Sequence, residues 1–334
     1  MNKKFISFDQ HSSVPKYRQI INSILVAIDN GTLAKGDKIP SINQICAEFN
    51  LSRDTVMVAF NELKAKGIII SQPGKGYYIA KTDIEQQERI FVVFDELNSF
   101  KEDLYNSFLK SLNSRASVDI FFHHFNYKVF KDLILESVGN YTSYVIMPAT
   151  FDNTSHLIEQ LPQDKVYILD RKKEDLERYP VIYQDFENDL YDSLNDGIHM
   201  IRKYEKMVLV NPGGKEPAER EVGFKRFCTE NNIQYEIIKN LQDVTIDANQ
   251  AFIVISDRDL VELVKRAQGR GLELGINFGI LSLNDTILKE VVGGGISTIS
   301  TDFRKMGARL ADMILDKEKL KIRNPASLII RSSL

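Results

Sequence analysis

The chain has 334 residues, more than one hydrophobic core usually supports, so we expect two or three domains. With 43% hydrophobic residues, 27% charged residues and a net charge of −3, its composition is typical of a folded globular protein and excludes wholesale disorder. The two cysteines, Cys46 and Cys228, lie far apart without metal-ligand spacing, which argues against a disulfide framework and a zinc finger.

The apolar runs are short throughout. No stretch approaches the roughly 20 apolar residues that a membrane span needs. The first ten residues, Met1 to Gln10, also lack the apolar centre of a signal peptide. We therefore expect a cytoplasmic protein without a membrane partner.

The charge is divided unevenly along the chain. Residues 1–81 contain 11 basic and 6 acidic residues, a net charge of +5, whereas the rest contains 32 basic and 40 acidic residues, a net charge of −8. A basic segment joined to an acidic body is typical of a phosphate-binding head on a regulatory body. Chance unevenness is the alternative.

Residues 1–80 show the pattern of a winged helix-turn-helix. Apolar residues recur at helical spacing in three segments, and two short strands follow around a glycine-rich turn. In chain order, the predicted helices cover 15–30, 41–49 and 53–66, and the predicted strands cover 68–70 and 77–79. Ser41 and Ser52 cap the second and third helices, and Gly67 ends the third.

The third predicted helix has the residues of a DNA-reading element. Arg53, in its first turn, can pair bidentately with guanine, while Ser52 and Thr55 can reach a phosphate or a base. In the turn between the two strands, Lys75 and Gly76 place a cation and exposed backbone N–H groups where a phosphate or the minor groove would lie. For either cation alone, simple solvation is the competing interpretation.

Four segments of this region form a recognisable set. They are Pro15-Lys-Tyr-Arg18, Leu33-Ala-Lys-Gly-Asp-Lys-Ile-Pro-Ser41, Leu51-Ser-Arg-Asp-Thr-Val56 and Gly74-Lys-Gly-Tyr-Tyr-Ile79. Together, over about residues 14–80, they resemble the DNA-binding domain of the GntR family of bacterial transcription regulators, which implies operator DNA as a partner.

The chain departs from the family pattern at two positions. The family often has arginine where this chain has Asn43 and Met57, so we expect an operator other than the commonest family sequence, with affinity from Lys64, Lys66 and Lys75. The DNA-binding candidates are Ser41, Asn43, Ser52, Arg53, Thr55, Lys64, Lys75 and Gly76.

Residues 81–88 are polar and patternless, which predicts a linker, and an α/β body follows. Apolar strands alternate with amphipathic helices, as in a parallel sheet with crossover helices, and the strands are too numerous for one small sheet. The predicted strands cover 89–94, 118–122, 144–147, 165–169, 207–210, 234–237, 251–255 and 279–283, and the predicted helices include 100–114, 188–203, 220–231 and 259–270.

Six segments of the body also form a set. They are Val166-Tyr-Ile-Leu-Asp-Arg171, Arg220-Glu-Val-Gly-Phe224, Val254-Ile-Ser-Asp257, Gly279-Ile-Leu-Ser-Leu-Asn-Asp-Thr286, Ile296-Ser-Thr-Ile-Ser-Thr301 with Met306-Gly307, and Leu328-Ile-Ile-Arg-Ser-Ser333. In this order, over about residues 88–334, they resemble the effector domain of the lactose- and galactose-repressor (LacI/GalR) family, itself similar to periplasmic sugar-binding proteins. A GntR-type head on such a body is similar to the arabinose-repressor branch of regulators.

The resemblance implies a homodimer with a two-lobed, periplasmic-binding-protein-like α/β body over 89–334. We expect one lobe at about 89–187 and 299–318 and the other at about 188–298 and 319–334. It also implies a small-molecule partner, a sugar, in the cleft between the lobes.

Effector-binding candidates follow strand ends, where open α/β sheets bind ligands. By family position, the first candidates are Arg220, Asp257 and Asn284, and the further candidates are Asp95, Phe100 and Phe186. For Asp257, a helix N-cap is the alternative role. For the further three, an ordinary loop position is the alternative.

An enzyme finds little support in the sequence. A Gly-x-Ser-x-Gly elbow is missing, and Asn211-Pro-Gly-Gly-Lys215 lacks the spacing of a phosphate-binding loop. His123 and His124 have no partner at metal spacing and are expected to be a surface pair. We therefore predict a transcription regulator, a repressor, without catalytic residues, cofactor or metal, whose operator affinity a monosaccharide or sugar derivative controls. A regulator that responds to a non-sugar metabolite, or that has lost effector binding, is the alternative.

Overall fold

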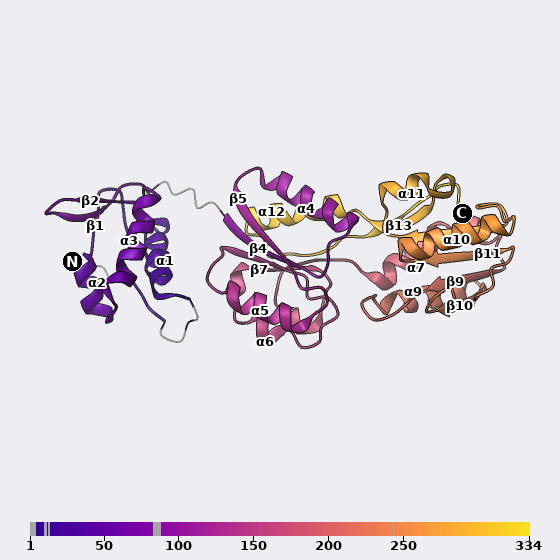
Figure 1. Cartoon of the computed structure of the whole chain (residues 1–334), viewed down its shortest axis with the longest axis horizontal. Helices are drawn as coiled ribbons and strands as arrows, with labels where there is room; N and C mark the ends of the chain where they lie inside the picture. Colours follow the sequence, from indigo (N-terminus) through magenta and orange to yellow (C-terminus); the bar gives the residue numbers. More distant parts are fainter. Residues whose placement is uncertain (1–4, 10–11, 13, 83–87, 243) are drawn as a thin grey trace. The chain divides into compact units, whose positions relative to one another are not determined.

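The computed structural model describes residues 5–9, 12, 14–82, 88–242 and 244–334 (Figure 1). The chain divides into two compact units. The first comprises the residues up to Glu88 together with Glu136–Thr142, and the second comprises Arg89–Leu135 and Ser143–Leu334. Of the linker predicted over 81–88, residues 83–87 lie outside the described part of the chain.

The first unit contains three helices and a small antiparallel sheet. Its elements are α1 (Lys16–Asp29), β1 (Lys38–Ile39), α2 (Ile42–Phe49), α3 (Arg53–Ala65), β2 (Ile69–Gln72) and β3 (Gly76–Ile79), with strand order β1-β3-β2. The apolar faces of the three helices meet in one core around Ile24, Ile45 and Phe60. The predicted winged helix-turn-helix is thus confirmed. Strand β1 was not predicted, because two residues are too few to show an alternating pattern.

The predicted helix caps are also present. The Ser41 side chain accepts a hydrogen bond from the Gln44 N–H, and the Gln44 side chain accepts one from the Ser41 N–H, which makes a capping box. Ser52 accepts from the Thr55 N–H in the same way. Local hydrogen bonds therefore fix where α2 and α3 begin.

The second unit contains two lobes, each built on a six-stranded sheet. The first lobe has strands β4 (Glu88–Phe94), β5 (Ala116–Phe122), β6 (Ser143–Ile146), β7 (Val166–Asp170), β8 (Val181–Tyr183) and β14 (Lys321–Arg323), in the order β14-β8-β7-β6-β4-β5. Its helices are α4 (Ser99–Leu112), α5 (Tyr127–Ser137), α6 (Ser155–Ile158) and α12 (Phe303–Leu315).

The second lobe repeats the design with one reversed edge. Its strands are β9 (Lys206–Val210), β10 (Gln234–Ile238), β11 (Gln250–Val254), β12 (Phe278–Leu283), β13 (Ser297–Thr301) and β15 (Ala326–Ile329), in the order β10-β9-β11-β12-β13-β15. The sheet is parallel except for β15, which runs antiparallel to β13. Its helices are α7 (Phe186–Asp196), α8 (Ile198–Ile201), α9 (Glu219–Glu230), α10 (Asp257–Gly269) and α11 (Ile287–Val291).

Two details differ from the sequence predictions. The helix predicted over 188–203 is divided into α7 and α8 at Gly197, which takes the C-cap of the first. The helix predicted over 259–270 begins two residues earlier, at Asp257. Among the described helices, none has the length and apolar character that a membrane span requires.

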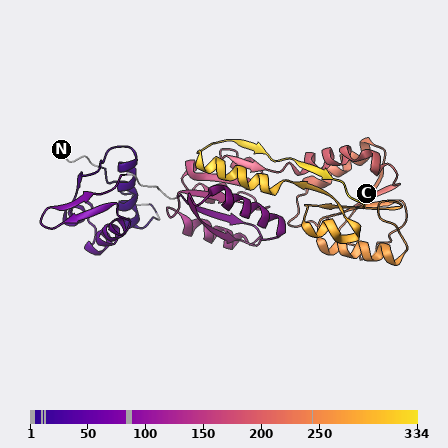
Figure 2. The ribbon, with the colours of Figure 1, turned by 90° about the horizontal axis from the view of Figure 1, so that it is seen from above.

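The chain passes between the lobes three times, and Figure 2 shows its C-terminal part, in yellow, extending through both. Strand β13 pairs with β12 in the second lobe, whereas β14 pairs with β8 in the first. The lobe boundaries predicted near 299 and 319 are therefore wrong by a few residues, because the crossings follow Thr301 and Arg323.

One buried asparagine joins the three crossings. The Asn324 backbone N–H donates to the Tyr183 carbonyl oxygen at 2.8 Å. Its side-chain amide donates to Thr301 Oγ1 at 2.6 Å and to the Asp302 carbonyl oxygen at 3.1 Å. Tyr183 and Thr301 each end a strand and Asn324 directly follows β14, all where the chain changes lobe, so these bonds tie the three connecting segments together.

Helices α4 and α12 of the first lobe pack at very short range (Figure 1). At Gly307 of α12, an added Cβ would lie 2.1 Å from the Leu104 carbonyl oxygen of α4. A glycine is required here because the two helix backbones meet without room for a side chain.

We predict that Gly307→Ala lowers the free energy of unfolding of the body by about 1–3 kcal/mol, because the methyl group forces the helices apart. Urea unfolding of the full-length protein, followed by circular dichroism, measures this loss. Gly269→Ala is the matched control, since Gly269 is also helical and an added Cβ there meets nothing within 4 Å. Equal stability of the two variants would contradict the close packing.

Candidate functional site

A cavity of about 320 Å³ lies between the two lobes of the second unit. Its walls come from the segments that follow β4, β7, β11 and β12, which is where open α/β sheets bind ligands. All six effector candidates line this cavity: Asp95, Phe100, Phe186, Arg220, Asp257 and Asn284.

A buried ion pair occupies the first-lobe side of the cavity. Asp95, just after β4, pairs with Lys101 of α4, and both side chains are less than a tenth exposed. The Asp95 carboxylate also accepts from the Glu96 N–H at 2.7 Å. The carboxylate is thus held by the protein itself, which fixes its position in the wall.

His123 is not part of a surface pair, so that prediction is wrong. Its side chain is fully buried, and Nε2 lies 3.2 Å from the Met147 carbonyl oxygen. Burial lowers the pKa of His123, although the Met147 hydrogen bond and Asp95 raise it. The ring packs against Phe130 and Phe151 and serves the core of the first lobe.

An aromatic ring between two guanidinium groups forms another wall. The Phe186 ring centroid lies 5.1 Å from Cζ of Arg220 and 5.1 Å from Cζ of Arg171. Arg220 is nearly buried and donates to Glu216 Oε2 at 2.9 Å. Burial lowers the pKa of Arg220, whereas Glu216 and Asp170 raise it. Stacking and ion pairing together fix the direction in which Arg220 points.

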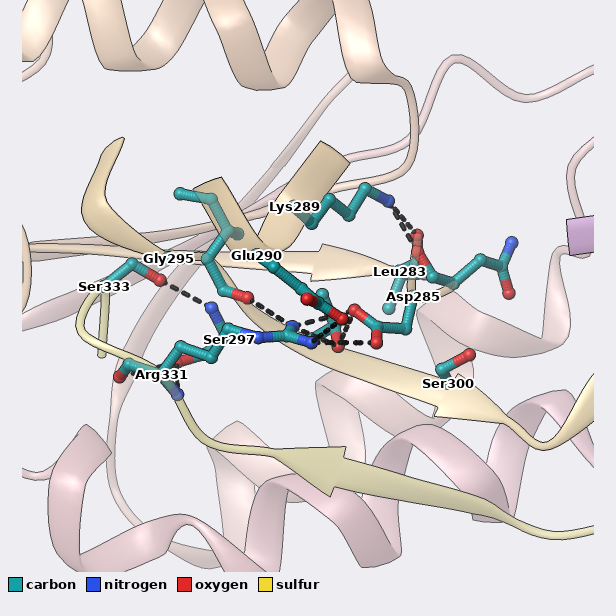
Figure 3. Close-up of polar contacts among 12 residues, drawn as sticks. Leu283, Asp285, Lys289, Glu290, Gly295, Ser297, Ser300, Arg331 and Ser333 are labelled. Carbon is teal, nitrogen blue, oxygen red and sulfur yellow. Dashed lines mark hydrogen bonds and ion pairs between the residues drawn. The ribbon is translucent and has the colours of Figure 1, made fainter. Parts of the chain in front are cut away.

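The second-lobe side of the cavity depends on a buried lysine (Figure 3). Lys289 Nζ donates to the carbonyl oxygens of Leu283, at 2.8 Å, and Asn284, at 2.6 Å. It also lies 3.4 Å from Asp257 Oδ1. Burial lowers the pKa of Lys289, while Asp257 raises it. Lys289 therefore joins the ends of β11 and β12 and sets the spacing of Asp257 and Asn284.

The alternative role for Asp257, a helix N-cap, is wrong. The N-cap of α10 is Ser256, whose hydroxyl accepts from the Asp259 N–H at 3.1 Å. Asp257 is the first helical residue, with its side chain half exposed beside the cavity.

A second ion pair fixes the loop that carries Asn284 (Figure 3). Arg331 binds both oxygens of Asp285, at 2.8 and 2.9 Å. Burial raises the pKa of Asp285, but hydrogen bonds from Arg331 and Thr298 and the Arg331 charge outweigh it, so the net shift is downward. Asn284 itself has a φ of +62°, a left-handed conformation that asparagine tolerates.

Several residues that line the cavity or hold its walls were not predicted. Lys101 and Lys289 gave no sequence signal, because their roles depend on partners that only the folded chain brings close. These partners are Asp95 for Lys101, and the Leu283 carbonyl oxygen and Asp257 for Lys289. Arg171 lies in one of the quoted segments, Val166–Arg171, which could have identified it. Arg171 Nη2 and Thr286 Oγ1 are buried without a hydrogen-bond partner in the described part of the chain, and both residues line the cavity. A ligand with hydroxyl or carboxylate groups would satisfy them.

One exposed ion pair connects the lobes beside the cavity. Lys215 Nζ lies 2.8 and 2.7 Å from the two oxygens of Glu96 and 5.4 Å from the Phe125 ring centroid. Lys215 follows two glycines, Gly213 and Gly214, both with positive φ. The described residues contain no group of three or more His, Cys, Asp or Glu side chains that could hold a metal ion.

In the first unit, five of the DNA-binding candidates lie at the starts of α2 and α3: Ser41, Asn43, Ser52, Arg53 and Thr55. The Ser41 and Ser52 hydroxyls cap α2 and α3, and Thr55 Oγ1 lies 2.7 Å from Ser52 Oγ. These three hydroxyl groups therefore form hydrogen bonds within the helix starts. Arg53 is exposed, and its Nη1 donates to Asn43 Oδ1 at 3.2 Å. The structure therefore joins two candidates from separate helices.

The basic candidates differ in their partners. Lys64 and Lys75 are exposed, Lys75 between β2 and β3, where Gly76 has a φ of +112° that suits glycine. Lys66, in contrast, pairs with Glu62 at 2.8 Å, and Arg18 binds the same carboxylate at 2.8 Å. Of the three lysines expected to contribute to DNA affinity, Lys66 is thus already paired with Glu62.

Two family models match this chain. Residues 16–79 match the model for bacterial regulatory proteins of the gntR family, and residues 202–334 match the periplasmic binding protein-like domain. The chain thus combines a GntR helix-turn-helix domain with a periplasmic-binding-protein-like domain.

Curated relatives match a short part of the chain. The HTH-type transcriptional repressor YtrA of Bacillus subtilis is 36% identical over 76 residues, which are 23% of this chain and 58% of that repressor. The uncharacterized HTH-type transcriptional regulator YdfD of the same species is 44% identical over 63 residues, 19% of this chain and 13% of that protein. The chain thus spans less than two thirds of the length of these relatives, which are transcriptional regulators.

Solved structures match the body. A dimeric lac repressor with an 11-residue C-terminal deletion has a TM-score of 0.63 at 17% identity, covering 73% of this chain and 98% of that one. The trehalose repressor from Escherichia coli has a TM-score of 0.61 at 14% identity, covering 73% and 100%. At such identities the likeness shows the two-lobed fold.

We predict that Lys101→Met lowers the free energy of unfolding by about 3–5 kcal/mol, because it leaves the Asp95 carboxylate buried without a cation. Urea unfolding measures the loss, and the double variant Lys101→Met with Asp95→Asn should recover much of it. Lys215→Met removes the exposed cross-lobe pair and should cost less than about 1 kcal/mol. A similar loss in Lys101→Met and Lys215→Met would show that burial of the Asp95–Lys101 pair does not increase its effect on the free energy of unfolding.

Proposed function

We propose that this protein is a sequence-specific transcription regulator, a cytoplasmic repressor, whose affinity for operator DNA is controlled by a small molecule bound between the lobes. The observation that carries the proposal is the presence in one chain of two parts. One is a winged helix-turn-helix with an exposed arginine at the start of its third helix, and the other is a two-lobed body with a polar cavity. The relatives' names support the same class of function.

The ligand that best fits the cavity is a monosaccharide or a sugar derivative. A cavity of about 320 Å³ is at the small end of ligand pockets. Arg220, Asp257 and Asn284 supply donors and acceptors for hydroxyl groups, and Phe100 and Phe186 supply apolar faces for the C–H side of a sugar ring. The unpartnered Thr286 hydroxyl adds one more site for a ligand hydroxyl.

A carboxylate-bearing metabolite is the second candidate. Arg171 supports it, because among the described residues its Nη2 has no hydrogen-bond partner and its ion-pair partner Glu219 is 3.7 Å away and half exposed. A carboxylate would bind this guanidinium bidentately. A regulator that has lost effector binding would show neither preference.

Control of DNA binding requires two states of the body. We propose that a homodimer places two heads on a palindromic operator, and that the ligand binds the closed cleft more tightly than the open one. The Glu96–Lys215 pair would form only in the closed state, because its partners belong to different lobes. Ligand binding would then alter head spacing and relieve repression.

Arg53→Ala is expected to cost about 1–3 kcal/mol of specific DNA binding, because it removes the candidate guanine contact. Fluorescence anisotropy on duplexes selected from a random library by the wild-type protein measures the change. Arg304→Ala is the control, since Arg304 is an exposed arginine of the body paired with Asp103. Unchanged binding by the Arg53 variant would rule out α3 as the reading helix.

A thermal-shift screen of monosaccharides, sugar phosphates and small carboxylates is expected to find a stabilising compound. A ligand at 100 times its dissociation constant adds roughly 2.7 kcal/mol to the stability of the folded state. Arg220→Ala and Asp257→Ala should abolish that shift and the ligand's effect on DNA binding, while DNA binding without ligand is unchanged. Arg226→Ala, in the same helix as Arg220 but paired with Glu187, should respond like wild type. A ligand response that survives both cavity variants would refute the cavity assignment.

A further inference from the structure

The exposed face of α3 combines one arginine with an apolar side chain. The buried positions of this helix are Val56, Ala59, Phe60 and Leu63. Arg53 and Met57 lie beside this buried stripe, four residues apart and therefore on one face, and Met57 is 37% exposed. An exposed methionine beside the arginine leaves apolar surface available to a partner.

Arg53 is oriented by a hydrogen bond and not by a carboxylate. Its Nη1 donates to Asn43 Oδ1 at 3.2 Å, and within the described part of the chain it forms no ion pair. A guanidinium has five N–H donors in a planar fork, so one bond to Asn43 leaves a two-donor edge free. Because Asn43 belongs to α2, the angle between the helices sets the direction of that edge.

The two side chains match two groups on the floor of the DNA major groove. Guanine presents N7 and O6 as a pair of acceptors that fits the arginine edge, and thymine presents the C5-methyl group as an apolar contact. Four residues of helix span about 6 Å, which is about two base-pair steps of 3.4 Å. The net charge of +5 over residues 1–81 favours a phosphate-rich partner such as duplex DNA.

Building on the proposed function, we infer that Arg53, positioned by Asn43, reads a guanine and that Met57 contacts the methyl group of a thymine within about two base pairs of it. Asn43 and Met57 then set the sequence preference of the head. Asn43 is a positioning residue, while Met57 touches the base directly.

The test uses the full-length protein and duplexes enriched by it from a random library. In the enriched duplex, each conserved guanine is replaced in turn by 7-deazaguanine, which lacks the N7 acceptor, and each conserved thymine by deoxyuracil, which lacks the methyl group. Dissociation constants are measured by fluorescence anisotropy at one fixed salt concentration. Thermal melting of each variant checks that it is folded.

Wild-type protein should lose roughly 3–5-fold in affinity at one thymine-to-uracil position, as expected for one apolar carbon removed from the interface. Met57→Ala should bind the thymine and uracil duplexes equally. Val58→Ala is the matched control, because Val58 is 49% exposed on the same helix but adjacent to Asp54, and it should keep the wild-type discrimination.

Asn43→Ala should lose most of its sensitivity to 7-deazaguanine at one position, while its affinity for random duplex and the dependence of that affinity on salt stay as in wild type. A purely structural role of Asn43 would instead weaken binding to all duplexes equally. If a sequence is enriched but Met57→Ala still discriminates thymine from uracil, the inference is overturned and the proposed function stands. The same holds if Asn43→Ala is still sensitive to 7-deazaguanine. Failure to enrich any sequence refutes the proposed function, and the inference with it.

Discussion

The geometry of the body depends on the hydrogen bonds of Asn324. Each lobe is assembled from segments far apart in the chain, so the backbone passes between the lobes in three connecting segments. Asn324 binds Tyr183, Thr301 and Asp302, and its own carbonyl oxygen accepts from Thr301 Oγ1 at 2.8 Å. Asn324 and Thr301 are buried, where an unmet hydrogen bond is expensive, so the three segments keep one arrangement. Gln184 and Phe186, which line the cavity, follow β8, one of the strands that end at this point.

The walls themselves are fixed by ion pairs internal to each lobe. Lys101 holds Asp95 on one side, and Lys289 joins Asp257 to the ends of β11 and β12 on the other. Each lobe thus presents a preformed half of the site. Other ion pairs join the two lobes: Arg323 of β14 binds Asp189 and Asp192 of α7, and Arg171 lies 3.7 Å from Glu219 of α9. The Glu96–Lys215 pair also joins them, is exposed and follows a two-glycine segment. An exposed pair such as Glu96–Lys215 breaks at little cost in free energy, whereas breaking a buried pair such as Asp95–Lys101 is expensive.

The sequence predicts this structure well where the signal is local. Ser41 and Ser52 identify the starts of α2 and α3, because a cap depends on residues three apart. The strands of the body were found because buried parallel strands are continuously apolar. In contrast, β14 has only three residues and is defined by its pairing with β8. The same limit applies to Lys289, whose importance depends on contacts made after the fold has formed.

The ion pairs of the cavity give ligand binding and DNA binding different dependences on ionic strength. Four of the carboxylates that line it (Asp95, Glu96, Glu216 and Asp257) already have a cation of the protein as partner. A neutral ligand would therefore enter without releasing or recruiting ions, and its binding would hardly depend on ionic strength. The proposed DNA binding by the basic head would release condensed counterions and therefore weaken steeply as the salt concentration rises. Under the proposed function, a rise in ionic strength would therefore weaken operator binding while leaving the concentration of ligand needed to fill the cavity unchanged.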